Sequence, residues 1–146
     1  MIKRCCGFTL IELVLVLVII GILSASALSR LNFAGHDAAG CAETVKASIR
    51  LAQKLAIAQR APATPVTVSV DGDCAVSVGG ESYPALNSVN VVNAGTVAFN
   101  GLGQPSVGGA LMTAARTFIV SGGDVARYIC LEAETGYVHE EAASCG

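Results

Sequence analysis

A single acidic residue beside an apolar segment is the first candidate for chemistry in this chain. Glu12 lies immediately before Leu13–Leu23, a stretch of aliphatic residues that only Gly21 interrupts. An ionised carboxylate left unpaired in hydrocarbon costs on the order of 3 kcal/mol. Cleavage after Gly7 would create a new amine on Phe8, a suitable cationic partner for Glu12 of a neighbouring subunit. The pattern therefore predicts proteolytic processing and charge-paired assembly at the N-terminus.

The leader and the apolar segment are arranged differently from a conventional secretory signal. Such a signal ends in small residues after its apolar core, whereas Gly7 precedes the core, so cleavage there keeps the apolar segment on the protein. Residues 8–28 make about 32 Å of helix against a hydrocarbon core of about 30 Å. We expect them to span a membrane. Two alternatives stay open: a plain single-pass anchor, and a signal cleaved at the small residues Ser24–Ala27.

The basic residues of the leader predict the orientation of the chain. Lys3 and Arg4 precede the apolar segment with no acidic residue beside them, and such residues stay on the cytoplasmic side. Residues 1–7 are then a cytoplasmic leader, residues 8–28 the membrane segment, and residues 29–146 a globular domain on the outer side. A chain of 146 residues has room for one such domain.

Four cysteines belong to the predicted outer domain, because Cys5 and Cys6 would leave with the leader. The four are Cys41, Cys74, Cys130 and Cys145. An oxidising compartment favours disulfides. Of the three possible connectivities we favour the pairing of sequential neighbours, which joins Cys41 to Cys74 and Cys130 to Cys145. A zinc site is the alternative, but no two of the four have Cys-x-x-Cys spacing.

The composition predicts an aliphatic core and argues against a nucleic-acid partner. Hydrophobic residues make up 53% of the chain and aromatic residues 5%, and tryptophan is absent. The net charge is -2 for the whole chain. Removal of the two basic leader residues leaves seven basic and eleven acidic side chains, a sum of -4. Such a surface gives phosphate groups little to bind.

An amphipathic helix is predicted over residues 41–60. Its apolar stripe is Val45, Ile49, Ala52 and Ala56, widened by Leu51 and Leu55. Basic residues form a row on another face: Lys46, Arg50 and Lys54. We interpret this row as a solvated face rather than as a contact for nucleic acid or an acidic partner. Pro62 and Pro65 end the helix.

Alternating apolar residues after this helix predict an antiparallel sheet. Val66–Val70 and Val76–Val78 flank Asp71-Gly72-Asp73 and predict a hairpin, an interpretation we prefer to a calcium site at the two aspartates. Further strands are expected at Val89–Val92, Val97–Asn100, Thr117–Ser121, Arg127–Leu131 and Tyr137–Glu140. The predicted fold class is α+β, with a long N-terminal helix whose second half packs on an antiparallel sheet domain.

No constellation for catalysis or cofactor binding is visible. His36 and His139 are the only histidines, and neither lies in a Cys/His or Ser/His motif. We therefore expect no enzyme activity, no resident metal and no cofactor.

The N-terminal sequence resembles a known processing signal. The eight residues from Gly7 to Val14, GFTLIELV, are similar to the prepilin signal of type IV pilins and type II secretion pseudopilins. The resemblance implies cleavage between Gly7 and Phe8 by a prepilin peptidase, N-methylation of Phe8, and docking of Glu12 against other pilin subunits. It also implies residence in the inner membrane with the domain in the periplasm, followed by extraction into a filament by an inner-membrane assembly platform.

Further stretches resemble the GspH/FimT group of minor pilins and pseudopilins, with MSHA-type pilus subunits nearest. They are Arg50–Arg60, Val97–Pro105 and Arg127–Val138. The resemblance implies a structural subunit of a pilus-like filament. A GspH-type pseudopilin, a DNA receptor and an adhesive minor pilin are the alternatives. DNA-binding members are thought to use arginines after a glycine, whereas here Gly136 is followed by Tyr-Val-His-Glu-Glu, which lacks the cations that phosphate binding requires.

Overall fold

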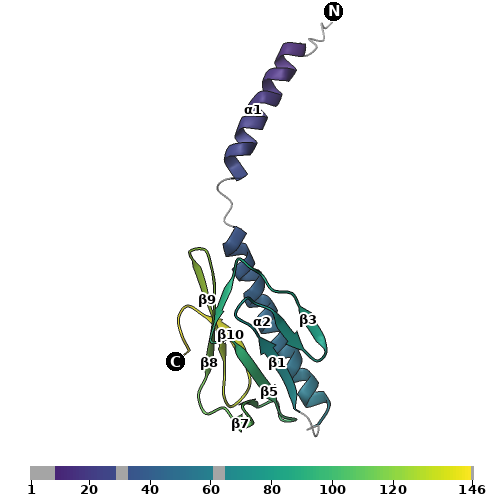
Figure 1. The fold of residues 1–146 in the computed structure, drawn as a ribbon, viewed down its shortest axis with the longest axis vertical. Helices are drawn as coiled ribbons and strands as arrows, with labels where there is room; N and C mark the ends of the chain where they lie inside the picture. The colour runs from purple at the N-terminus through teal and green to yellow at the C-terminus, as the bar shows by residue number, and fades with distance from the viewer. Residues whose placement is uncertain (1–8, 29–32, 61–64, 146) are drawn as a thin grey trace, which may run out of the picture. The chain divides into compact units, whose positions relative to one another are not determined.

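The computed structural model describes residues 9–28, 33–60 and 65–145. The chain divides into two compact units, Met1–Asn32 and Phe33–Gly146. The first contains helix α1, Leu10–Leu28. The second contains helix α2 and ten strands in two antiparallel sheets (Figure 1). The predicted α+β class is therefore confirmed, with helix α2 packed on antiparallel sheets.

Helix α2 runs from Phe33 to Ala58 and begins eight residues before the predicted start. The predicted stripe is correct, since Val45, Ile49, Ala52 and Ala56 are fully buried. The first turn of α2 packs closely against Gly122 of β8. A Cβ atom added at Gly122 would lie 2.3 Å from the carbonyl oxygen of Ala34, so a residue with a side chain would not fit at this position.

The first sheet has six strands in the order β3-β2-β1-β5-β6-β7. They are β1 Val66–Val70, β2 Val76–Val78, β3 Glu81–Tyr83, β5 Gly95–Phe99, β6 Pro105–Val107 and β7 Ala110–Leu111. The predicted hairpin is confirmed, because β1 pairs antiparallel with β2 and Val70 lies opposite Val76. The Asx turn between them is closed by Asp73 Oδ1, which accepts a hydrogen bond from the backbone N–H of Ala75 at 3.2 Å.

The second sheet has four strands in the order β10-β9-β8-β4. They are β4 Asn90–Val92, β8 Arg116–Gly122, β9 Val125–Leu131 and β10 Val138–Glu141. Each overlaps a predicted strand. Strands β3, β6 and β7, of two or three residues each, were not predicted.

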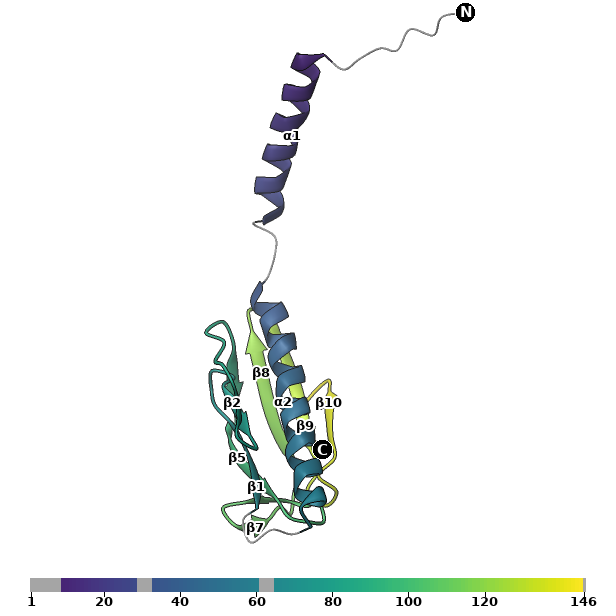
Figure 2. The same cartoon turned by 90° about the vertical axis from the view of Figure 1, so that its right-hand side faces the viewer.

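Helix α2 packs against strands of both sheets, including β1, β2, β8 and β9. Figure 2 shows α2 lying along the sheets, with β1, β2 and β5 to its left, β10 to its right, and β8 between α2 and β2 in this view. The core between these elements is aliphatic, as predicted, apart from the two fully buried rings of Phe99 and Phe118. One helix therefore packs against both sheets.

Candidate processing and assembly site

The first turn of α1 is capped by Thr9. The backbone N–H of Glu12 donates hydrogen bonds to Thr9 Oγ1 at 3.3 Å and to the Thr9 carbonyl oxygen at 3.1 Å. Thr9 and Glu12 have the spacing of a capping box, and a carboxylate in the first turn also interacts favourably with the helix dipole. The capping role of Thr9 was not predicted, although the pattern Thr-x-x-Glu in the sequence is the signal of a capping box.

The side chains of α1 from Leu10 to Ser24 are exposed on every face. Glu12 is exposed, and Leu10, Leu13 and Val16 are exposed to 82%, 54% and 42%. No described residue forms an ion pair with the Glu12 carboxylate. A helix that is apolar all round needs burial in a membrane or in an assembly. The described residues provide no such burial for α1 and no countercharge for Glu12.

The cleavage junction Gly7–Phe8 lies outside the described residues, so cleavage and N-methylation there remain predictions. Within the part of the chain that the structure describes, no helix meets both the length and the apolarity needed to cross a bilayer. The predicted membrane span over residues 8–28 is therefore not confirmed.

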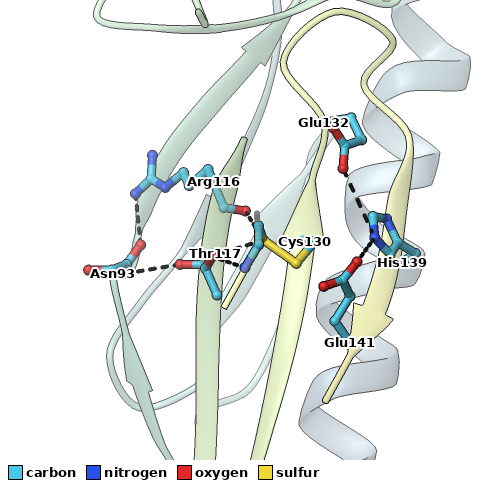
Figure 3. The surroundings of a disulfide bond; sticks show 8 residues. Asn93, Arg116, Thr117, Cys130, Glu132, His139 and Glu141 are labelled. Carbon is cyan, nitrogen blue, oxygen red and sulfur yellow. Dashed lines mark hydrogen bonds and ion pairs between the residues drawn. A yellow bond between two sulfur atoms is a disulfide. The ribbon is translucent and has the colours of Figure 1, made fainter. Parts of the chain in front are cut away.

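The cysteines of the described residues form two disulfides, which join sequential neighbours. Cys41 of α2 is bonded to Cys74, in the turn after β1, with Cα atoms 6.1 Å apart. Cys130 of β9 is bonded to Cys145 near the C-terminus, with Cα atoms 5.6 Å apart. The backbone N–H of Cys145 donates to Thr117 Oγ1 of β8 at 3.1 Å (Figure 3). The first disulfide ties α2 to the first sheet, and the second ties the C-terminal tail to the second sheet.

The basic row on α2 is a solvated face at Arg50 and Lys54, as predicted, but not at Lys46. Lys46 is 8% exposed, and its Nζ lies 2.7 Å from Glu43 Oε1 and 2.9 Å from Glu140 Oε2 of β10. Arg50 donates to the carbonyl oxygen of Val138 at 3.0 Å. The prediction was wrong for Lys46, because Glu140 of β10 lies beside that side chain. Arg50 and Lys54 are exposed, as predicted, although Arg50 also contacts the backbone of β10.

The ion pair between Lys46 and Glu140 changes the pKa of both groups. Burial lowers the pKa of Lys46, but hydrogen bonds with Glu140 and Glu43 outweigh it and leave that pKa above its ordinary value of 10.5. The hydrogen bond from Lys46 lowers the pKa of Glu140 against the opposing effect of burial, and Arg127, at 2.7 Å, lowers it further. Glu140 of β10 thus forms ion pairs with Lys46 of α2 and with Arg127 of β9.

Comparison with known proteins identifies the N-terminal segment. The family model of the prokaryotic N-terminal methylation motif matches residues 2–28. The chain carries a type IV pilin signal. This signal supports the pilin and pseudopilin family, and it indicates prepilin peptidase processing, membrane anchoring and assembly into pilus filaments. No curated protein and no solved structure matches the chain.

Proposed function

We propose that the protein is a minor pilin or pseudopilin, a structural subunit of a type IV pilus-like filament. The observation that carries the proposal is the coincidence of the methylation motif with an exposed helix, apolar on all faces, whose first turn holds one acidic residue. The local resemblances at Arg50–Arg60 and Arg127–Val138 favour a subunit of an MSHA-type pilus. A GspH-type pseudopilin of type II secretion is the alternative within the same family.

The proposed sequence of events begins in the inner membrane. The apolar segment of residues 8–28 anchors the precursor, with residues 1–7 in the cytoplasm and the disulfide-containing domain in the periplasm. Prepilin peptidase cleaves between Gly7 and Phe8, and Phe8 is N-methylated. The assembly platform then extracts the subunit into the filament. The proposal includes no catalytic role and no cofactor.

Glu12 has two candidate roles in this scheme, and they require different chemistry. Pairing with the Phe8 amine of a neighbouring subunit requires its negative charge. Completion of the capping box with Thr9 requires only a side chain that can hydrogen-bond at that position, which glutamine also provides. We propose that the charge is the role that matters for assembly, because an ionised Glu12 in an apolar environment is costly until the Phe8 amine of a neighbouring subunit pairs with it.

Two variants separate these roles, and the readout is the amount of protein in sheared filaments relative to the membrane. Glu12→Val removes both the charge and the capping group, whereas Glu12→Gln removes the charge alone. We expect both variants to be cleaved and to stay in the membrane, and both to be strongly depleted from filaments. Wild-type incorporation of Glu12→Gln would show that charge pairing is not required.

A further inference from the structure

A cluster of potential metal ligands lies on one face of the β9–β10 pair. His139 lies directly opposite Cys130 in the strand register, and Glu141 follows on the same face of β10. Glu132 comes immediately after β9. The alternate side chains Leu131 and Val138 are buried in the core, so the cluster lies on the face of the sheet opposite α2.

Two carboxylates converge on one nitrogen of the imidazole ring. His139 Nε2 lies 3.0 Å from Glu141 Oε1 and 4.0 Å from Glu132 Oε1 (Figure 3). Nitrogen and oxygen ligands bonded to one tetrahedral zinc ion at about 2.0 to 2.2 Å lie about 3.3 to 3.5 Å from each other. The two measured distances bracket this separation for each nitrogen–oxygen pair. The two glutamate side chains, each 44% exposed, would rotate toward each other to bring all three atoms around one ion.

The surroundings hold the cluster in place and leave it accessible. The ring of Tyr137 stacks on His139, with centroids 5.3 Å apart and an angle of 17° between the planes. The side chain of His139 is 24% exposed, and those of Glu132 and Glu141 are each 44% exposed. An ion could therefore reach the cluster from solvent. The pairing of β9 with β10 already holds the backbone of the three residues close together.

The nearby sulfur does not belong to the site in the oxidised protein. Cys130 Sγ, a nitrogen of His139 and an oxygen of Glu141 lie within 4.8 Å of one another. Cys130 is bonded to Cys145, however, and only a free thiolate is a strong zinc ligand. Its disulfide instead fixes the part of β9 that lies opposite His139.

We propose that His139, Glu141 and Glu132 bind one divalent transition-metal cation of the zinc class. Imidazole with carboxylates suits such an ion, whereas magnesium and calcium prefer sites built of oxygen. Three protein ligands leave a position for water. The ion would link the end of β9 to the edge strand β10. The sequence alone predicted no role for His139, because only the pairing of β9 with β10 brings Glu132 close to it.

The test is a zinc titration by calorimetry of the full chain in detergent, kept oxidised. Cys5→Ser and Cys6→Ser substitutions remove the leader thiols, which would otherwise bind zinc. We expect one saturable Zn²⁺ per chain. His139→Ala and Glu141→Gln should each weaken the affinity by at least about tenfold, since even indirect partners of a metal site contribute that much.

Matched controls keep the result specific. His36→Ala removes the other histidine, and Glu134→Gln removes an exposed carboxylate close in sequence to Glu132; neither should change the affinity. The proposal would be overturned by a lack of saturable binding, by unchanged affinity in His139→Ala, or by binding that appears only after reduction of the disulfides. The last result would assign zinc to the cysteine thiolates. None of these outcomes bears on Glu12 or on filament assembly.

Discussion

The two described helices differ in how far their apolar side chains are buried. Helix α2 buries a narrow stripe that includes Val45 and Ile49 against two sheets, and it places polar residues elsewhere. Helix α1 has aliphatic residues on every face, and Leu10 and Leu17 are exposed to 82% and 60%. The stability of α2 is therefore provided within the globular unit, whereas under the proposed function α1 would be buried in a membrane or against other subunits.

Charged residues show the same contrast. Lys46 on α2 is enclosed between Glu43 and Glu140, both within the globular unit. Glu12 on α1 has no cationic partner among the described residues. The ion pairs of Lys46 therefore contribute to the stability of the globular unit. The carboxylate of Glu12 has no such pair and could bind a cation on another subunit.

The largest effect on folding is expected where α2 enters the core. Ile49→Ala removes a fully buried side chain and should lower the free energy of unfolding of the globular unit by about 2 to 5 kcal/mol. Ile57→Ala on the same helix removes a side chain that is 47% exposed and should change it by less than about 0.5 kcal/mol. Chemical denaturation measures both. Equal effects would contradict the assignment of a buried and an exposed face to α2.

The same measurement extends the comparison to α1. Leu17→Ala removes an exposed residue of that helix, so the unfolding free energy of the globular unit should stay unchanged while filament incorporation falls. A loss of stability in the globular unit as large as that of Ile49→Ala would show that α1 is part of its fold.

The two disulfides should differ in their contribution to stability. The sequence separations are 33 residues for Cys41–Cys74 and 15 residues for Cys130–Cys145. The chain-entropy model gives about 4 kcal/mol for the longer loop and about 3 kcal/mol for the shorter. Replacing each pair by serines and measuring thermal unfolding under oxidising conditions tests this order. Unchanged melting temperatures in both variants would mean that the bonds do not form in the protein.

A smaller, pH-dependent effect is expected from the Lys46–Glu140 ion pair. The pKa of Glu140 is lowered in the folded state, so its contribution is present above the ordinary value of 4.5 and is lost as the pH falls through the folded value. The pKa of Lys46 is raised, so its contribution is present below 10.5 and is lost as the pH rises through the folded value. The pair therefore stabilises the fold across the neutral range.

Glu140→Gln tests this window. At neutral pH it should cost about 1 kcal/mol of unfolding free energy, because Glu140 is partly exposed and Glu43 still pairs with Lys46. The difference from the wild type should shrink as the pH falls below 4.5 and through the lowered pKa of Glu140. Glu134→Gln, which changes an exposed carboxylate, is the control. A difference that does not vary with pH would mean that the loss is one of packing rather than of charge.

Sequence patterns predicted the elements whose signal is local. Alternating valines around Asp71-Gly72 predicted the β1–β2 hairpin, and the spacing from Val45 to Ala56 predicted the buried face of α2. The strands β6 and β7 have two or three residues each, too few for a period, and β6 begins with a proline that disfavours strands. Short strands of this kind depend on their neighbours.

The remaining surprises involve partners distant in sequence. Lys46 looked like a solvated residue because Glu140, its partner, is 94 residues away. Convergence of Glu132 and Glu141 on His139 requires the β9–β10 register, which no local pattern specifies. The processing signal was visible from the start, because a protease reads it from a short contiguous stretch of sequence.

The most direct test of the central claim is the intact mass of the protein recovered from sheared filaments of its native host. The account predicts a chain that begins at Phe8, is one methyl group heavier than the unmodified sequence and contains two disulfides. Recovery only as an unprocessed chain beginning at Met1, and never in the filament fraction, would contradict it.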